Sequence, residues 1–337
     1  MITASTKRRA QNMAHWGAFT ADVENGRLVG ILPLKGDRRP SPMLQTIPGA
    51  VHHRCRIAQP MVRRSFLARR ENSDRSLRGA EPFVAVSWND ALDLVTAELQ
   101  RVKSGFGSES IYEGSGWASP GKLHNAKAVM SRFLNLFGGA VEPVTNYSFG
   151  AASVIVPHVV GSMDPVLGGV TSWPVIAEHT QLFVSFGGLA PKNAQVNSGG
   201  LSDHDLQDSL KSLSRVNFVY LGPSRSDAPE GLRAEHLMIR PGTDTAVMLG
   251  LAHTLLAEGL HDRAFLARYC TGFERFSPYL TGASDGQPKD ADWAGAIAGI
   301  DADAIRGLAR RMAKNRTMLT ASWSCAATYM KKPVSRS

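Results

Sequence analysis

Short apolar runs alternate with helical patterns over residues 181–323, and this alternation constrains the fold of the chain more than any other feature. The runs that have the length of buried strands are 181–186, 216–221, 236–240 and 317–322. Patterns typical of helices lie at 202–213, at 245–259 and after Asp301, a residue type that caps helices. Strands joined by helices form parallel sheets covered on both faces. The sequence therefore predicts an α/β fold built on a parallel sheet.

The N-terminal part has a different character, rich in strands and turns. Residues 18–23 and 27–32 flank the turn Glu24-Asn25-Gly26. An Asn-Gly pair between two short strands is a strong hairpin signal. We expect a small β-rich segment at this end of the chain.

Two amphipathic helices are expected after the hairpin. The first begins after Ser87, which can cap it together with Asp90, and ends near Gly105. The second covers 123–137 and stops at a Gly-Gly pair, and short extended segments are expected at 110–112 and 141–144. The predicted parts of the chain are a β-rich segment 1–57, an α/β domain 58–160, a domain with the parallel sheet at 161–324, and a polar tail 325–337 without helical period.

Charge and hydropathy narrow the classes of protein. No apolar run approaches the roughly 18 residues of a membrane-spanning helix, so we predict no membrane span. The formal net charge is +9, and eight arginines fall between Arg54 and Arg78. This stretch fits a solvated surface or a partner with several negative charges. Nucleic acid is disfavoured, because no aromatic residues interleave with the arginines to stack on bases.

The cysteines argue against metal clusters. Cys55, Cys270 and Cys325 lie far apart and form no CxxC pair, so neither a zinc ribbon nor an iron–sulfur cluster is indicated. A sparse, odd number of cysteines suits a reducing compartment. Arg8-Arg9 suggests an export signal, but no apolar stretch follows the pair. These patterns predict a cytoplasmic protein.

The carboxyl ends of the predicted strands carry the residues most suited to a ligand. In open α/β sheets ligands bind beyond these ends, and here the ends bear glycine, proline, serine, threonine and aspartate. Neither GxGxxG at the start of a helix nor GxxxxGK[ST] is present. A nucleotide would therefore be held by a different set of loops.

Three single residues stand out, each with a structural alternative. Ser148 lies before a predicted helix in a near miss to the GxSxG nucleophile elbow, and it fits a helix cap equally. Trp117, in a Gly-rich loop, is either a packing residue or an indole N–H donor facing a cavity. Asp244 is either a first-turn carboxylate favoured by the helix dipole or an acceptor for a guanine edge or a ribose.

Several motifs, taken together and in order, resemble the molybdopterin oxidoreductase family in its dimethyl-sulfoxide-reductase branch. The motifs that carry this resemblance are His15-Trp16-Gly17, Gly26-Arg27-Leu28, Pro60-Met61-Val62-Arg63, Ser115-Gly116-Trp117, Asn146-Tyr147-Ser148, Gly150-Ala151-Ala152 and Pro241-Gly242-Thr243-Asp244. They span residues 15 to about 324. Within the branch the chain looks most like biotin sulfoxide reductases and trimethylamine N-oxide reductases.

The resemblance implies a Rossmann-like sheet and a molybdenum ion held by two molybdopterin guanine dinucleotides. Ser148 matches the serine that ligates the metal, and an alkoxide suits a hard, high-valent ion. Trp117 matches the tryptophan that hydrogen-bonds the oxo group. The residues that match loops around the guanine dinucleotide are Pro191, Lys192, Asn193, Gly222, Pro223, Ser224, Pro241, Gly242, Thr243, Asp244 and Trp323. The implied reaction is oxygen-atom transfer from a small-molecule S-oxide or N-oxide, with electrons from an unidentified donor.

The chain departs from the family pattern in three ways. Ser115 stands where reductases of dimethyl sulfoxide have tyrosine, which favours biotin sulfoxide, methionine sulfoxide or an N-oxide as substrate. The cysteine cluster of the iron–sulfur-bearing branches is missing. The pattern also stops after Trp323-Ser324, where family members continue with a Gln-Arg pair and a long further chain. We therefore expect a fold that is incomplete relative to the family and lacks the second dinucleotide-binding domain.

Three further hypotheses stay open. A truncated chain would be an inactive cofactor-binding fragment, whose sheet edge after Ser324 would favour aggregation. A serine hydrolase built on Ser148 is disfavoured, because the elbow lacks its first glycine and no histidine partner is evident. A nucleic-acid binder would depend on the arginine-rich stretch alone.

Overall fold

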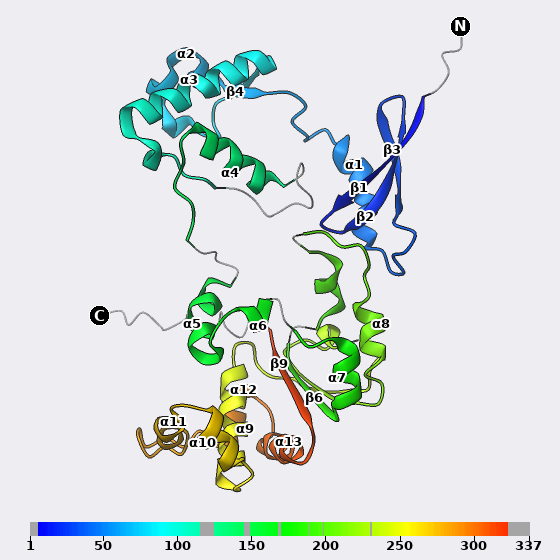
Figure 1. Ribbon diagram of the computed structural model, residues 1–337, viewed down its shortest axis with the longest axis vertical. Coiled ribbons are helices and arrows are strands. Elements are labelled where there is room, and N and C mark those ends of the chain that lie inside the picture. Colours follow the sequence, from blue (N-terminus) through cyan, green and yellow to red (C-terminus); the bar gives the residue numbers. More distant parts are fainter. Residues whose placement is uncertain are drawn as a thin grey trace. The chain divides into compact units, whose positions relative to one another are not determined.

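The computed structural model describes residues 6–114, 125–144, 149–167, 170–187, 189–197, 199–229 and 231–322, apart from the side chains of residues 165 and 167. The chain forms two compact units (Figure 1). Unit 1 consists of Met1–Val144 and Val196–His204, and unit 2 consists of Thr145–Gln195 and Asp205–Ser337. The chain therefore passes between the units three times.

Helices separate most of the strands that follow the N-terminal sheet. The strands are β1 (Lys7–Ala14), β2 (Gly17–Glu24), β3 (Arg27–Pro33), β4 (Met61–Arg63), β5 (Phe83–Ala85), β6 (Leu182–Phe186), β7 (Asn217–Leu221), β8 (Ala234–Leu237) and β9 (Thr317–Ala321). The α-helices are α1 (Ile47–Val51), α2 (Arg64–Arg69), α3 (Trp88–Phe106), α4 (Ala126–Phe137), α5 (Gly150–Val160), α6 (Asp164–Leu167), α7 (Trp173–His179), α8 (Leu206–Lys211), α9 (Asp244–Ala257), α10 (Arg263–Tyr269), α11 (Phe273–Leu280), α12 (Ala291–Ala298) and α13 (Ala302–Lys314). Short 3-10 helices are η1 (Pro42–Thr46), η2 (Arg70–Asn72), η3 (Arg75–Leu77), η4 (Ser108–Ser110), η5 (Pro191–Gln195) and η6 (Arg225–Asp227).

Unit 1 contains the predicted hairpin within an antiparallel sheet of order β1-β2-β3. Asn25 and Gly26 both have positive φ, 51° and 76°, as a two-residue hairpin turn requires. The inward side chains of β2 and β3 pack on Leu44 of η1, which is fully buried. The hairpin is confirmed, whereas β1 was not expected, because most of its residues are polar and exposed and show no apolar alternation.

The segment Val196–His204 completes unit 1 from a distant part of the sequence. The backbone of Ala18 donates to Leu201 O at 2.9 Å, and Asn197 N donates to His15 O at 3.0 Å. The buried carboxylate of Asp37 accepts from both the backbone N–H and the ring Nδ1 of His204, at 3.2 and 2.7 Å. These bonds hold the returning segment in place on the N-terminal sheet.

The start of α3 and the end of α4 agree with the sequence, whereas α4 begins at Ala126 rather than at 123 and the short helices α1 and α2 were not predicted. Ser87 Oγ accepts from Asp90 N at 3.1 Å at the start of α3, and Gly138 adopts the left-handed conformation at the end of α4. The expected strand at 110–112 is wrong. Residues 108–110 form η4, because the chain turns tightly after Gly107, and Tyr112 makes only an isolated bridge to Val141.

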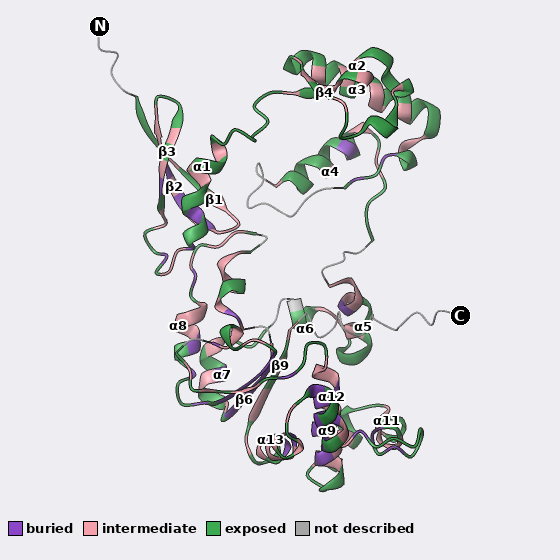
Figure 2. Cartoon of the chain, turned by 180° about the vertical axis from the view of Figure 1, so that it is seen from behind, coloured by how far each residue is buried: buried purple, intermediate pink, exposed green. Residues whose placement is uncertain are grey.

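The helix α3 is amphipathic yet has no buried residue. Its apolar side chains at a heptad-like spacing include Trp88, Leu92, Val95 and Phe106, each more than half exposed. Figure 2 shows the contrast with unit 2, where buried residues are concentrated on β6, α9 and α12.

Unit 2 contains the predicted parallel sheet, in the order β8-β7-β6-β9. The side chains of β6 and β7 are buried on both faces, apart from Asn217. One face packs on α9, α12 and α13, and the other carries Phe183, Phe218 and Tyr220 against α7 and α8. The mixed α/β class with a small β-rich N-terminal segment is confirmed.

Close packing of helices supports one face of this sheet. A Cβ on Gly250 of α9 would lie 2.7 Å from Ala294 Cβ of α12, so this contact requires glycine. The helices α10 to α12 were not predicted, and β8 covers 234–237 rather than 236–240. The helix expected at 202–213 is shorter, because residues up to His204 belong to unit 1. No helix in the described part of the chain is long and apolar enough to cross a membrane.

Candidate functional site

The topology of the parallel sheet in unit 2 determines where a ligand would bind. The chain runs from β6 to β7 to β8 in one direction across the sheet and then returns to place β9 on the other side of β6. Open α/β sheets bind ligands beyond the carboxyl ends of the strands, at the point where the strand order reverses. In this sheet that point lies beyond Phe186 and Ala321, the last residues of β6 and β9.

Gly187 and Ser322 are the first residues after these two strands. Gly187 has φ +68°, and a Cβ there would lie 3.1 Å from Ser322 Oγ. The buried Ser185 hydroxyl donates to Gly187 O at 2.6 Å, and Gly187 N donates to Leu221 O at 2.9 Å. The glycine thus lets the two strand ends approach closely and fixes the backbone there.

Gly222 occupies the corresponding position after β7. A Cβ on this residue would lie 2.7 Å from Tyr220 Cζ, closer than real Cβ contacts. His236 Nε2 donates to Gly222 O at 2.8 Å, and the His236 ring lies 5.3 Å from the Tyr220 ring, centroid to centroid. The loop Gly222-Pro223-Ser224 therefore rests directly on these two rings.

Two of the predicted cofactor loops meet through an ion pair. Lys192, in η5, contacts Asp227 Oδ1 at 2.5 Å, and Asp227 closes η6, which begins just after Ser224. The Ser224 and Ser226 hydroxyls are hydrogen-bonded to each other at 2.8 Å. The structure thus joins the segment Pro191-Lys192-Asn193 to η6, which follows Gly222-Pro223-Ser224; the role of these residues in holding a cofactor stays a prediction.

The third predicted loop, Pro241 to Asp244, leads into α9. Thr243 Oγ1 donates to Arg240 O at 2.7 Å, and Asp244 is the first residue of the helix. The Arg240 guanidinium donates to the carbonyls of Ala296 and Ile297, which fixes the start of the loop on α12. Asp244 is half-buried and lies close enough to Tyr220 to act on its ionisation.

Tyr220 is the buried ionisable side chain beneath these loops. Burial raises the pKa of its phenol, and the carboxylates of Asp227 and Asp244 raise this pKa further. The phenol therefore stays protonated at neutral pH and can donate a hydrogen bond. Tyr220, His236 and Ser185 were not predicted as site residues, since each lies in or next to an apolar strand pattern and resembles a core position.

The predicted residues Trp117, Ser148 and Trp323 lie outside the described residues, so their positions relative to these loops stay predictions.

The arginine-rich stretch is only partly available to a partner. The Arg63 guanidinium donates to Glu81 Oε1 at 2.8 Å, and Ser65 N and Oγ donate to the same carboxylate at 2.7 and 2.6 Å. Hydrogen bonds from Ser65, together with Arg63, lower the pKa of Glu81. Arg63 is thus part of the internal structure of unit 1, whereas the other arginines between Arg54 and Arg78 are exposed.

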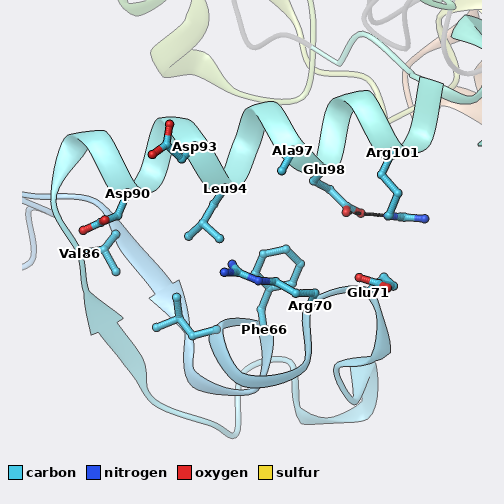
Figure 3. Close-up of a pocket in the computed structure, with 11 residues that line it drawn as sticks. Phe66, Arg70, Glu71, Val86, Asp90, Asp93, Leu94, Ala97, Glu98 and Arg101 are labelled. Carbon is cyan, nitrogen blue, oxygen red and sulfur yellow. Dashed lines mark hydrogen bonds and ion pairs between the residues drawn. The ribbon is translucent and has the colours of Figure 1, made fainter. Parts of the chain in front are cut away.

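A cavity of about 670 Å³ in unit 1 lies between α3 and the segment that contains Phe66 and Arg70. Figure 3 shows these two side chains pointing toward α3, with Leu94 opposite them. Charged residues of both signs line the cavity: Arg70, Arg101, Glu71, Asp90, Asp93 and Glu98. Since the carboxylates outnumber the guanidiniums, the cavity does not suit a cofactor with several phosphates, and none of the predicted site residues lines it.

Protein-derived metal sites are not found in the described part of the chain, where no group of three histidine, cysteine, aspartate or glutamate residues is placed to hold an ion. His52 and His53 instead accept hydrogen bonds from the backbone of Leu28 and Cys55, both at 3.2 Å. These bonds give both histidines a role in the local structure of unit 1.

Comparisons with known proteins identify the family. The family model described as Molybdopterin oxidoreductase matches residues 56–333, and that described as Molybdopterin oxidoreductase N-terminal domain matches residues 12–52. The fold is similar to that of acetylene hydratase from Pelobacter acetylenicus, with a TM-score of 0.54 at 20% identity, over 94% of this chain and 42% of that one.

Curated relatives are similar over most of this chain. A dimethyl sulfoxide/trimethylamine N-oxide reductase from Rhodobacter capsulatus is 44% identical over 92% of the chain, and trimethylamine-N-oxide reductase 1 from Escherichia coli (strain K12) is 43% identical over 92%. Biotin sulfoxide reductase from Cereibacter sphaeroides is 42% identical over 88%. The chain spans 38%, 37% and 40% of the lengths of these three relatives. The family that they represent is one that uses a molybdenum–pterin cofactor. With family models covering most of its residues, this chain belongs to the molybdopterin oxidoreductase family.

Proposed function

We propose that this chain is the N-terminal part of a molybdenum-dependent reductase of S-oxides or N-oxides, with biotin sulfoxide, methionine sulfoxide and trimethylamine N-oxide as candidate substrates. The observation that carries the proposal is the 42–44% identity, over about nine-tenths of the chain, to relatives named as reductases of dimethyl sulfoxide, trimethylamine N-oxide or biotin sulfoxide. The electron donor is a further partner, and neither nucleic acid nor an iron–sulfur cluster is part of the proposal.

The loops at the carboxyl ends of the sheet fit the nucleotide part of a bis(molybdopterin guanine dinucleotide) cofactor. At Gly187 and Gly222 a Cβ would crowd neighbouring atoms, so glycine lets these loops pack closely on the strand ends. Lys192 supplies a positive charge, and Asp244 supplies an acceptor. Residues 191–193, 222–224 and 241–244, with Trp323, are proposed to hold one dinucleotide. Their placement in one unit, around the strand ends, supports this assignment.

Trp117 and Ser148 are proposed to be the residues that act directly in the reaction. When bound, the molybdenum cofactor supplies two-electron reduction of an S–O or N–O bond. The Ser148 hydroxyl, once deprotonated, would be the protein's ligand to the metal, and the Trp117 indole N–H would donate a hydrogen bond toward the substrate oxygen. Ser115 in place of tyrosine is proposed to disfavour dimethyl sulfoxide as substrate.

Metal and nucleotide analysis tests the proposal. The chain is expressed in a host that makes the cofactor, purified, and analysed for molybdenum by mass spectrometry and for GMP released by acid. Reduction of biotin sulfoxide, trimethylamine N-oxide and dimethyl sulfoxide is followed with a reduced dye. Ser148→Ala should lose molybdenum and turnover, with Ser153→Ala in α5 as the control. Protein without molybdenum, GMP or turnover would refute the proposal, as would full activity in Ser148→Ala.

A second candidate is carried by the share of the relatives' length, 37–40%, that the chain spans. In this candidate the 337 residues bind cofactor without turnover. Bound GMP with no reductase activity would favour it over the first proposal.

A cytoplasmic location is also proposed, from the sparse cysteines, of which Cys55 and Cys270 are free; cell fractionation tests it.

A further inference from the structure

Tyr220 carries a buried hydroxyl that has no hydrogen-bond partner among the residues that the structure describes. Its side chain is 2% exposed and packs with Phe183 and Phe218 on one face of the sheet. No hydrogen bond to its hydroxyl is found among the described residues, although buried hydroxyls are almost always paired. A phenylalanine would pack there without the desolvation cost, so the hydroxyl points to a ligand.

The hydroxyl is aimed at the loop that follows its own strand. The atoms nearest to a Cβ built on Gly222 are all from the Tyr220 phenol, so only a glycine leaves this approach open. The three fully enclosed polar atoms that lack a partner in the described part of the chain are Gln195 Oε1, Asp203 Oδ1 and His204 Nε2. Tyr220 Oη is not one of these atoms, and the inference requires that a molecule bound at the loop can reach it.

The orientation of the phenol is held from the side. The His236 ring packs on it at 5.3 Å between centroids, and His236 Nε2 is itself held by Gly222 O at 2.8 Å. The aromatic side chain thus cannot turn away without breaking this arrangement. The hydroxyl is fixed before a ligand arrives, as a specificity-determining donor should be.

We propose that the Tyr220 hydroxyl reads the base of the bound nucleotide by donating a hydrogen bond to the O6 oxygen of guanine. This inference rests on the proposed function, since it needs a guanine nucleotide in these loops. The Asp227 and Asp244 carboxylates close to the phenol provide acceptors, which suit the N1–H and N2–H donors beside O6 on the same edge. Adenine presents an amino group in place of O6 and offers the phenol no acceptor there.

The ionisation of Tyr220 agrees with this role. The two carboxylates and burial raise the pKa of the phenol, so it remains a donor across the physiological range. A phenolate would instead repel O6 and lose the hydrogen bond. The donor is therefore available whenever the loops are folded.

Equilibrium dialysis with GDP, IDP and ADP tests the inference on the whole 337-residue chain. IDP keeps O6 and N1–H but lacks the N2 amino group. Tyr220→Phe should lower the affinity for GDP and IDP about ten-fold, which is the effect of one neutral hydrogen bond. The affinity for ADP should not change. Tyr269→Phe, at a tyrosine 65% exposed on α10, should leave all three unchanged.

Stability without nucleotide separates a ligand contact from a structural role. The midpoint of urea unfolding for Tyr220→Phe should equal or exceed that of the unmodified chain, because no hydrogen bond to a described residue is lost. A clearly lower midpoint would overturn the inference. Equal loss for all three nucleotides would also overturn it, because the hydroxyl would then contact ribose or phosphate.

The outcomes for the unmodified chain distinguish the two proposals. If it binds GDP and Tyr220→Phe binds GDP equally well, the inference about Tyr220 fails while the proposed function stands. If the unmodified chain binds no guanine nucleotide at millimolar concentration, the proposed cofactor loops fail and the inference fails with them.

Discussion

Replacing Gly222 by alanine tests whether the loop after β7 rests on the Tyr220 phenol as the structure describes. The added Cβ would lie 2.7 Å from Tyr220 Cζ and 3.0 Å from Cε1. Tyr220 cannot retreat, because it is buried among Phe183, Phe218 and the His236 ring. We expect the sheet to be strained rather than the side chain to rotate.

The size of the expected destabilisation follows from the crowding of the added Cβ against the Tyr220 ring. Overpacking of a well-packed site costs about 1–3 kcal/mol, and Gly222→Ala should lower the free energy of unfolding of unit 2 by that amount. In a Tyr220→Leu background, in which the phenol is absent, the same change should cost almost nothing. The coupling between the two positions should therefore equal most of the single-variant cost.

Gly307→Ala is a matched control, for which we expect the free energy of unfolding to rise rather than fall. Gly307 lies inside α13 with no atom within 4 Å of a built Cβ, so alanine there should stabilise unit 2 by about 1 kcal/mol through helix propensity. Hydrogen exchange of the β6 and β7 amides reads the stability of unit 2 separately from that of unit 1. A cost for Gly222→Ala that persists in the Tyr220→Leu background would refute the reasoning.

Two further predictions concern the core and acid stability. Phe183→Ala removes a ring stacked 4.9 Å from that of Phe218 and should cost about 3–5 kcal/mol, whereas Phe265→Ala, at a side chain 53% exposed, should change unfolding little; equal effects in urea unfolding would contradict the packing described. Because Ser65 and Arg63 lower the pKa of Glu81, its stabilising contribution is complete above the usual carboxyl pKa of 4.5 and is lost as the pH falls below it. The protection factors of the β4 and β5 amides, which correct the exchange rate for the intrinsic rate at each pH, should therefore fall on acidification, and less so in Glu81→Gln; an unchanged pH dependence of the protection factors in that variant would rule out this role.

Much of the fold follows from local patterns in the sequence. The Asn25-Gly26 turn, the Ser87 cap and the apolar runs of β6, β7 and β9 act through backbone conformation and burial within a few residues. These signals do not depend on distant partners, so they are visible in one sequence. The alternation of strand and helix then predicts the parallel sheet and the edge at which ligands bind.

The remaining elements depend on contacts between distant residues. The strand β1 is mostly polar and is paired only because β2 offers a free edge. The expected helix at 202–213 is cut short by the bonds from His204 to Asp37, which lies 167 residues earlier. No local pattern of residues 202–204 reports such a partner.

The candidate site also has parts that the sequence indicates and parts that it does not. The cofactor loops at 191–193, 222–224 and 241–244 come from the resemblance, and their role stays a prediction; the structure adds the ion pair of Lys192 with Asp227 in η6. Tyr220, for which we infer contact with a base, was not predicted as a site residue, because a tyrosine in an apolar strand is usually a core residue. The metal-ligand role of Ser148 and the donor role of Trp117 remain predictions.

The returning segment Val196–His204 has a consequence for biosynthesis. A nascent chain leaves the ribosome from its N-terminus, so β6 is already made when this last piece of unit 1 emerges. Until His204 has been synthesised, the Asp37 carboxylate lacks its hydrogen bonds to this residue. The N-terminal sheet likewise lacks the backbone hydrogen bonds that it makes to the returning segment. Folding in the order of synthesis, one unit after the other, is therefore ruled out for this architecture: the first unit to begin is completed only after the second has started.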